Sequence, residues 1–110
     1  MKSEKEGQLF HNILDIIKQI PEGKVATYGQ IAAMAGTQNP RLVGFALAGL
    51  KDNTTVPWFR VINSKGQISF PEDSDGFKIQ YSLLSNERII FDAKNCINLE
   101  QFGWKITENG

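Results

Sequence analysis

The sequence predicts a mainly α-helical (α+β) fold, a winged helix-turn-helix-like domain with a short β-hairpin as its wing. Three observations lead to this class. Apolar residues recur at helical spacing in three segments before residue 51, a short polar turn over residues 36–39 joins the second segment to the third, and two short apolar runs flank a turn at residues 63–66. We expect residues 1–110 to form a single domain, because a chain of this length has the size of one domain.

The first two helices are predicted from their apolar faces and their end signals. Over residues 8–20 one helical face is apolar, and Pro21 and Gly23 end the segment. That face consists of Leu9, Ile13, Ile16, Ile17 and Ile20. Thr27 and Gln30 have the spacing of a capping box, in which the threonine hydroxyl accepts a backbone N–H and the glutamine side chain reaches back. Gly36 closes this second helix.

A third helix is expected from Asn39 to about Leu50. Asn39 is a good N-cap, and Pro40 at the first helical position loses no needed hydrogen bond. The second helix of a helix-turn-helix commonly docks on DNA. Many helical hairpins touch no DNA, so this pattern is a weak signal by itself.

The second half of the chain predicts the wing and a further helix. Residues 57–62 and 67–70 read as the two strands of a hairpin around the turn at 63–66. A helix over residues 77–86 would turn Ile79, Leu83 and Leu84 inward, and residues 87–91 are typical of a short strand. Phe102 and Trp104, near the C-terminus, are expected to complete the core.

Composition excludes several classes of protein. Hydrophobic residues make up 41% of the chain, as in globular proteins, and no apolar run approaches the ~20 residues that cross a bilayer. The polar start lacks the apolar stretch of a signal peptide, so we expect a cytoplasmic protein. We also expect a monomer. Cys96 is the single cysteine and His11 the single histidine, which argues against an internal disulfide and a multi-cysteine zinc site. No cofactor or metal is expected.

Charge is distributed unevenly although the net charge is zero. Residues 23–71 hold five basic side chains against Asp52 alone, whereas residues 72–110 hold seven acidic side chains against four basic ones. A basic middle and an acidic end suit a surface that faces an anion on one side. Ordinary scatter of surface charge explains the pattern equally well.

Three stretches together resemble one known family. They are residues 20–32 (IPEGKVATYGQIA), 40–47 (PRLVGFAL) and 57–62 (PWFRVI). They are similar to the DNA-binding domain of the O6-alkylguanine-DNA alkyltransferases, over roughly residues 8–88. In that family the third motif reads Pro-Cys-His-Arg-Val, and its cysteine accepts the alkyl group. Here Trp58 and Phe59 stand at the cysteine and histidine positions, which resembles the alkyltransferase-like proteins that bind these lesions without repairing them.

The chemistry of these two residues leads to the same conclusion. Dealkylation of guanine needs a strong, soft nucleophile, in practice a thiolate. The indole of Trp58 has no ionisable nucleophile near neutral pH and only one N–H to donate. Cys96 lies far from this motif in sequence and is expected to be a small buried or half-buried residue. We therefore expect no enzyme activity and no catalytic residues.

The resemblance implies roles for two residues in nucleotide flipping. Arg41 would fill the gap that a flipped nucleotide leaves in the base stack, as a planar guanidinium can. Tyr28 would help to turn that nucleotide out. The alternatives are a phosphate contact or surface charge for Arg41, and a helix anchor for Tyr28.

Further residues are assigned to DNA and lesion binding. Trp58 would form a flat wall of the lesion pocket, although a core position is the alternative. Val61 and Ser64 match pocket-side positions, and Lys65 is a candidate phosphate contact. Small residues on the third helix, Gly44 and Ala46 with Ala48, would allow close approach to the minor groove, or else close helix packing. Arg60 and Glu87 are expected to be structural, and Pro71-Glu72 to form the far rim of the pocket.

The resemblance implies a partner and a function. The partner is double-stranded DNA containing alkylated guanine. The complex would be passed to a nucleotide-excision-repair damage-recognition protein of the UvrA type. Two alternatives are an active alkyltransferase, against which the missing cysteine argues, and a sequence-specific winged-helix regulator. Such a regulator reads the major groove with polar side chains, which residues 42–49 hardly offer.

Overall fold

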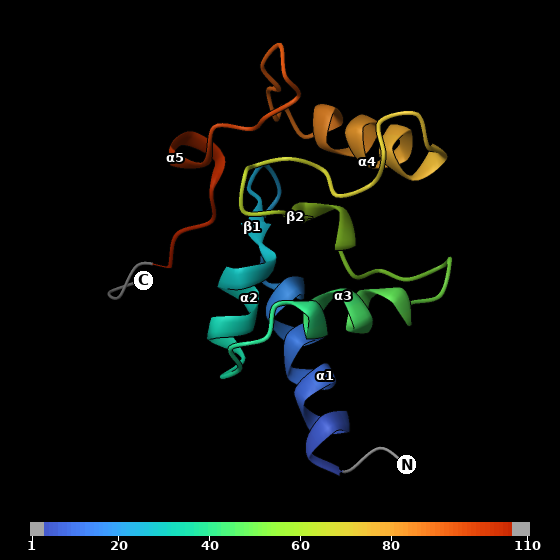
Figure 1. Cartoon of the computed structure of the whole chain (residues 1–110), viewed down its shortest axis with the longest axis vertical. Helices are drawn as coiled ribbons and strands as arrows, with labels where there is room; N and C mark the ends of the chain where they lie inside the picture. The colour runs from blue at the N-terminus through green and yellow to red at the C-terminus, as the bar shows by residue number, and fades with distance from the viewer. Residues whose placement is uncertain (1–3, 107–110) are drawn as a thin grey trace.

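The computed structural model describes residues 4–106, as a small mainly helical fold with one two-stranded sheet (Figure 1). Along the chain its elements are α1 (Glu4–Lys18), β1 (Ala26–Thr27), α2 (Tyr28–Met34), α3 (Arg41–Ala48), the 3-10 helix η1 (Trp58–Arg60), β2 (Val61–Ile62), α4 (Asp75–Asn86) and α5 (Leu99–Phe102). Helices α1, α2 and α3 form one layer, and α4 and α5 with their connecting loops form the other (Figure 1). The described helices include none that is long and apolar enough to span a bilayer.

Two adjacent cores lie on either side of the small sheet. β1 and β2 pair in parallel, with Ala26 opposite Val61 and Thr27 opposite Ile62. Successive side chains of a strand point to opposite faces. Accordingly Ala26 and Val61 belong to the core shared by α1, α2 and α3, whereas Ile62 belongs to the core under α4. The sheet thus joins the helix-turn-helix to the second half of the chain.

The first three helices confirm the predicted helix-turn-helix. The apolar face of α1 is as expected, with Ile13 and Ile17 buried, although the helix runs from Glu4 to Lys18 rather than over residues 8–20; Ile20 is buried just beyond its end. Gly36 adopts a positive φ of 85° after α2 and lets the chain turn sharply. Helix α3 begins one residue later than expected, with Pro40 at the N-cap position, and Asn39 still satisfies the helix start because its Oδ1 accepts the Arg41 N–H over 3.1 Å.

Only one half of the predicted capping box forms at α2. The Thr27 hydroxyl accepts the backbone N–H of Gln30 over 3.1 Å. The Gln30 side chain does not reach back, and instead its Nε2 donates to the carbonyl of Trp104 over 2.8 Å. The C-terminal segment runs beside β1, since the Trp104 N–H donates to the Val25 carbonyl over 2.7 Å, and so offers Gln30 a partner that the local sequence does not reveal.

The predicted β-hairpin wing is wrong for residues 57–70. The turn exists, because the Asn63 N–H donates to the Gln67 carbonyl over 3.0 Å, but the return segment forms no strand. The backbone of β2 is already paired with β1. The other side of the turn bonds to a later segment, because the Ile97 N–H donates to the Gly66 carbonyl over 2.8 Å. Gly66 is required there, since a Cβ would lie 2.5 Å from the Ile97 carbonyl oxygen.

Helix α4 was predicted, but its inward face is shifted. The helix starts at Asp75, two residues before the expected start, and Ser74 caps it by accepting the Phe77 N–H over 3.2 Å. Leu84 is buried as expected, whereas Ile79 is 53% exposed and Gln80 takes the inward position. The short strand predicted over residues 87–91 is also wrong, because Arg88 turns the chain with a φ of 70°.

The segment after α4 folds as a tight loop that returns to the second core. Phe91 and Ile97 form an isolated antiparallel bridge across it. Backbone N–H groups of Cys96 and Lys94 donate to the Asp92 carboxylate, and they hold the pKa of that carboxyl below its ordinary value of 3.8. Phe102 packs against the second core and Trp104 against the first, as the sequence predicts.

Candidate nucleic-acid interface

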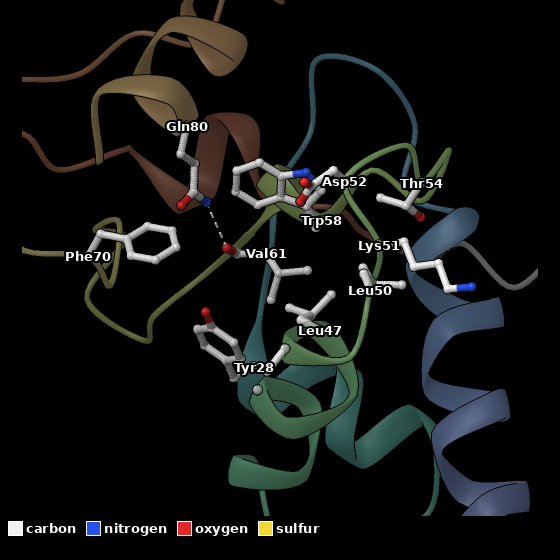
Figure 2. Close-up of a pocket in the computed structure, with 12 residues that line it drawn as sticks. Tyr28, Leu47, Leu50, Lys51, Asp52, Thr54, Trp58, Val61, Phe70 and Gln80 are labelled. Atoms are coloured by element: carbon white, nitrogen blue, oxygen red, sulfur yellow. Dashed lines mark hydrogen bonds between the residues drawn. The ribbon is translucent and has the colours of Figure 1, made fainter. Parts of the chain in front are cut away.

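A cavity of about 490 Å³ lies between α3 and the segment formed by η1, β2 and α4 (Figure 2). This volume is within the range of small-molecule sites. The lining is largely apolar and aromatic and comes from both layers of the fold: Tyr28, Gly44, Leu47, Ala48, Leu50, Lys51, Asp52, Thr54, Trp58, Val61, Phe70 and Gln80. The structure therefore brings Tyr28, Trp58 and Val61 together at one cavity, and it adds Gly44, which was assigned to the minor groove.

Trp58 lies at the start of η1, where the chain enters the cavity wall. Its backbone N–H donates to the Val56 carbonyl over 2.8 Å, directly after Pro57. Its ring meets that of Phe59 edge to face, with centroids 5.8 Å apart. Phe59 packs against the second core, so this contact fixes the indole of Trp58 against that core. The half-exposed indole is part of the cavity lining and is not a core residue.

Tyr28 is the first residue of α2 and combines a half-buried ring with a free hydroxyl. The ring packs against the first core, and Figure 2 shows the hydroxyl directed into the cavity. Among the side chains that the structure describes (residues 7–106), this hydroxyl has no hydrogen-bond partner. Tyr28 thus anchors the helix start and also presents a polar group to whatever enters the cavity. Val61, 1% exposed, closes the cavity beside it.

Gln80 holds the cavity wall in place, and the sequence analysis missed it. The side chain is 3% exposed, and its Nε2 donates to the carbonyls of Phe59 and Val61 over 2.9 and 3.1 Å. These bonds fasten η1 and β2 to α4 beneath the cavity. A polar residue between Phe77 and Leu84 at helical spacing was the available signal, because a buried amide must find partners.

Phe70 forms the side of the cavity that faces Trp58 and Tyr28 (Figure 2). It occupies the position for which the sequence suggested Pro71-Glu72, and both of those residues are exposed and outside the lining. The Phe70 ring lies against Gly76 in the first turn of α4, where an added Cβ would stand 2.8 Å from the ring. Gly76 therefore leaves room for Phe70.

Substituting Gly76→Ala is expected to displace Phe70 and weaken ligand binding at the cavity. We expect binding to fall about fivefold, which corresponds to about 1 kcal/mol of lost contact with an aromatic wall. The free energy of unfolding should change by no more than about 1 kcal/mol, since alanine is the better helix former. Gly7→Ala is the matched control, because nothing lies within 4 Å of the added Cβ in α1. Equal binding by both variants would contradict a role for the Phe70 wall.

Arg41 lies outside the cavity lining, at the exposed start of α3. Its guanidinium forms no ion pair with any residue that the structure describes. Gly44 and Ala48 are one turn and two turns further along, at the cavity edge. Ala46 is 6% exposed and part of the first core, so it offers DNA almost no surface. The small side chain of Ala46 therefore serves helix packing and not DNA contact.

Ser64 and Lys65 are exposed on the turn that follows β2 and do not line the cavity. The backbone N–H of Lys65 donates to Oδ1 of Asn63 over 2.9 Å, which fixes the turn. The Lys65 ammonium has no ion-pair partner among the acidic side chains described between residues 7 and 106. A phosphate contact for Lys65 stays a prediction.

Arg60 and Glu87 support the interface from the inside, as predicted. The guanidinium binds the carboxylate through Nε and Nη2, with Nε 3.0 Å from Oε1, and its Nη1 donates to the Ile20 carbonyl over 2.8 Å. Glu87 also accepts the Gly23 N–H over 3.0 Å. Both side chains are nearly buried, at 16% and 11% exposed. They join η1, the end of α1 and the end of α4.

The single cysteine and histidine both lie away from the cavity. Cys96 is half-buried, and its Sγ accepts Nε2 of Gln67 over 3.2 Å. His11 is exposed on α1 beside Asp15, with Nε2 3.2 Å from Oδ2. Among the described residues no group of three His, Cys, Asp or Glu side chains could hold a metal ion.

The exposed start of α3, the adjoining aromatic cavity and the helix-turn-helix define a DNA-binding domain, and comparison with known proteins agrees. Residues 8–89 match the family model described as the 6-O-methylguanine DNA methyltransferase DNA-binding domain. The chain belongs to this family. The resemblance inferred from the three sequence stretches is confirmed.

Three similar relatives are base-flipping or alkyltransferase-like proteins, and methylated-DNA–protein-cysteine methyltransferases also match over shorter stretches. A DNA base-flipping protein of Vibrio parahaemolyticus is 54% identical, over 89% of this chain and 97% of its own length. The base-flipping protein of Escherichia coli is 35% identical over 94% of this chain and 79% of its own. Alkyltransferase-like protein 1 of Schizosaccharomyces pombe is 37% identical over 89% of this chain and 95% of its own.

Solved structures agree with this placement. The S. pombe alkyltransferase-like protein in complex with damaged DNA containing O6-carboxymethylguanine superimposes with a TM-score of 0.82, at 35% identity, over 96% of this chain and 100% of that one. The O6-methylguanine methyltransferase of Mycobacterium tuberculosis in complex with DNA matches with a TM-score of 0.59, at 26% identity, over 80% of this chain and 52% of that one. The fold is thus the alkyltransferase-like fold with a DNA-binding helix-turn-helix.

Proposed function

We propose that this protein binds double-stranded DNA, flips an O6-alkylated guanine into the cavity and holds it there without removing the alkyl group. The observation that carries the proposal is the aromatic cavity beside the exposed start of α3, with Trp58, Tyr28 and Phe70 in its lining. A flipped purine finds flat surfaces to stack on there, and each such contact is worth about 1–3 kcal/mol.

The alkyl group stays on the guanine because the cavity lining contains no nucleophile of sufficient strength. Its polar members are an amide, a hydroxyl of Thr54, a phenol, an ammonium and a carboxylate, and none is a thiol. Cys96 belongs to a different hollow, beside Asp92 and Phe102. Trp58 therefore converts the site from one of reaction into one of recognition.

The relatives support the same mode of action. Those from V. parahaemolyticus and E. coli are named for base flipping, and the S. pombe protein has been seen on DNA that carries an O6-alkylguanine. On this chain Arg41 would fill the gap in the stack, Tyr28 would press on the flipped nucleotide, and Lys65 would meet a phosphate. We place the docking in the minor groove, where the small residues Gly44 and Ala48 of α3 permit close approach.

Excision repair is the proposed fate of the lesion. A protein that holds an alkylated base without reacting leaves the damage in the DNA, so a second activity must remove it. A cytoplasmic damage-recognition protein of the UvrA type would recognise the bound, distorted duplex. The alkyltransferase-like protein would act as a monomer that marks the site.

A sequence-specific regulator is less well supported. The exposed residues of α3 are Arg41, Phe45, Ala48 and the following Gly49, which offer one side chain able to read base edges. A helix with such a surface suits recognition of DNA shape and damage better than recognition of sequence.

The absence of alkyl transfer can be tested by mass spectrometry. After incubation with a duplex containing one O6-methylguanine, we expect the protein mass to be unchanged and the DNA to retain its lesion. An active alkyltransferase treated in parallel should gain one methyl group, and the Cys96→Ser variant should behave as the unaltered chain. A methylated protein would overturn the proposal.

A further inference from the structure

Phe45 is a large apolar side chain at the centre of the exposed face of α3. It is 59% exposed, whereas its helix neighbours Val43 and Ala46 are buried in the first core. The core therefore does not need Phe45. No ring or cation of the described chain stacks on it.

Phe45 lies on the same face of α3 as Arg41. Residues four apart lie on the same helical face, so Phe45 stands one turn beyond Arg41 on the side that faces away from the core. Ala48, on the same face, borders the cavity. Phe45 is thus the one bulky apolar group on a surface that otherwise consists of a single cation and very small residues.

We propose that Phe45 is a wedge that enters the minor groove beside Arg41, presses between two base pairs and helps to bend the duplex. This inference rests on the proposed function, since it requires DNA to lie along α3. Apolar side chains in the minor groove commonly unstack a base step and kink the duplex in this way. The occupant is DNA because the neighbouring guanidinium of Arg41, which has no ion pair among the described residues, is attracted to the negative charge of a duplex and can stack on its bases, whereas an apolar partner would leave that charge without a partner.

The spacing gives the wedge a definite place on the duplex. Four helical residues span about 6 Å. Base pairs are stacked about 3.4 Å apart. Phe45 would therefore act about two base pairs from the gap that Arg41 fills. Phe45 touches none of the cavity, so it should deform lesion-containing and undamaged duplexes alike.

The test uses Phe45→Ala, with Ile79→Ala as the matched control. Ile79 has similar exposure, at 53%, and lies on α4. Binding is measured on duplexes with and without O6-methylguanine. 2-Aminopurine placed about two base pairs from the lesion reports unstacking, and energy transfer between the duplex ends reports bending.

We expect Phe45→Ala to bind both duplexes roughly tenfold more weakly, with less 2-aminopurine fluorescence and less bending, and to keep its preference for the lesion. Phe45→Leu should retain most of the bending, because it keeps apolar bulk. Thermal unfolding should be unchanged, since the side chain is exposed. If Phe45→Ala matches Ile79→Ala in affinity, fluorescence and bending while the unaltered chain prefers the lesion, the wedge is wrong and the proposed function stands. If the unaltered chain shows no preference, the proposed function fails, and the wedge fails with it.

Discussion

The Glu87→Gln substitution is expected to lower the free energy of unfolding by about 3 kcal/mol, at the low end of the cost of breaking a buried ion pair. Glutamine keeps the shape and can still accept the Gly23 N–H, but it leaves the Arg60 guanidinium nearly buried without a counter-charge. Urea unfolding followed by circular dichroism measures the change. Because this pair joins η1 to the ends of α1 and α4, the cavity should lose its shape in the variant as well.

The matched control is Asp15→Asn, which removes the same kind of charge from an exposed pair. The Asp15 side chain is 50% exposed and its partner His11 is 68% exposed. Exposed pairs contribute little, so we expect a change of no more than about 0.5 kcal/mol. A similar decrease in the free energy of unfolding for both variants would show that the buried position of Glu87 does not make its ion pair more stabilising than an exposed one.

Arg41→Ala and Tyr28→Ala are expected to weaken binding to a lesion duplex by about 1–3 kcal/mol each, the range for contacts directed at bases. The preference for the lesion over plain DNA should fall with them, because both residues act on the flipped nucleotide. Fluorescence anisotropy at several salt concentrations measures affinity and its salt dependence together. The affinity of Tyr28→Phe for the lesion duplex should lie between those of the unaltered chain and of Tyr28→Ala, since this substitution removes only the hydroxyl that points into the cavity.

The salt dependence separates the two possible roles of Arg41. If Arg41 only contacts a phosphate, its removal should weaken binding equally on both duplexes and lower the slope of log affinity against log salt by about one. A stacked guanidinium should instead reduce the preference for the lesion. Arg88→Ala is the matched control, because Arg88 is exposed after α4 and lies neither on α3 nor in the cavity lining.

Local signals explain why the helices could be predicted and the sheet could not. Helical periodicity and capping residues such as Asn39 depend on residues that are close in sequence, so the sequence predicts α1, α2, α3 and α4. β1 and β2 have two residues each and pair across more than thirty positions of the chain, which leaves no periodic pattern to read. The sequence predicts a hairpin in place of the β1–β2 pair, because the turn at residues 63–66 is a local feature and does form in the structure.

The cavity was predicted in part, and the resemblance accounts for most of what was predicted. Tyr28, Trp58 and Val61 occupy motif positions and do meet at one cavity. Phe70 and Gln80 were missed because tertiary packing, not local sequence, brings them there. Ala46 was assigned to the groove because a small residue suits close approach to DNA and close helix packing equally well, and burial decides for the second.

The central claim, recognition of alkylated guanine without chemistry, is tested most directly by a competition binding measurement. Matched duplexes with and without one O6-methylguanine would compete for the unaltered protein at a fixed, stated salt concentration. We expect the lesion duplex to bind roughly ten- to a hundredfold more tightly, the range that one or two stacking contacts supply. Equal affinity for the two duplexes would contradict the account.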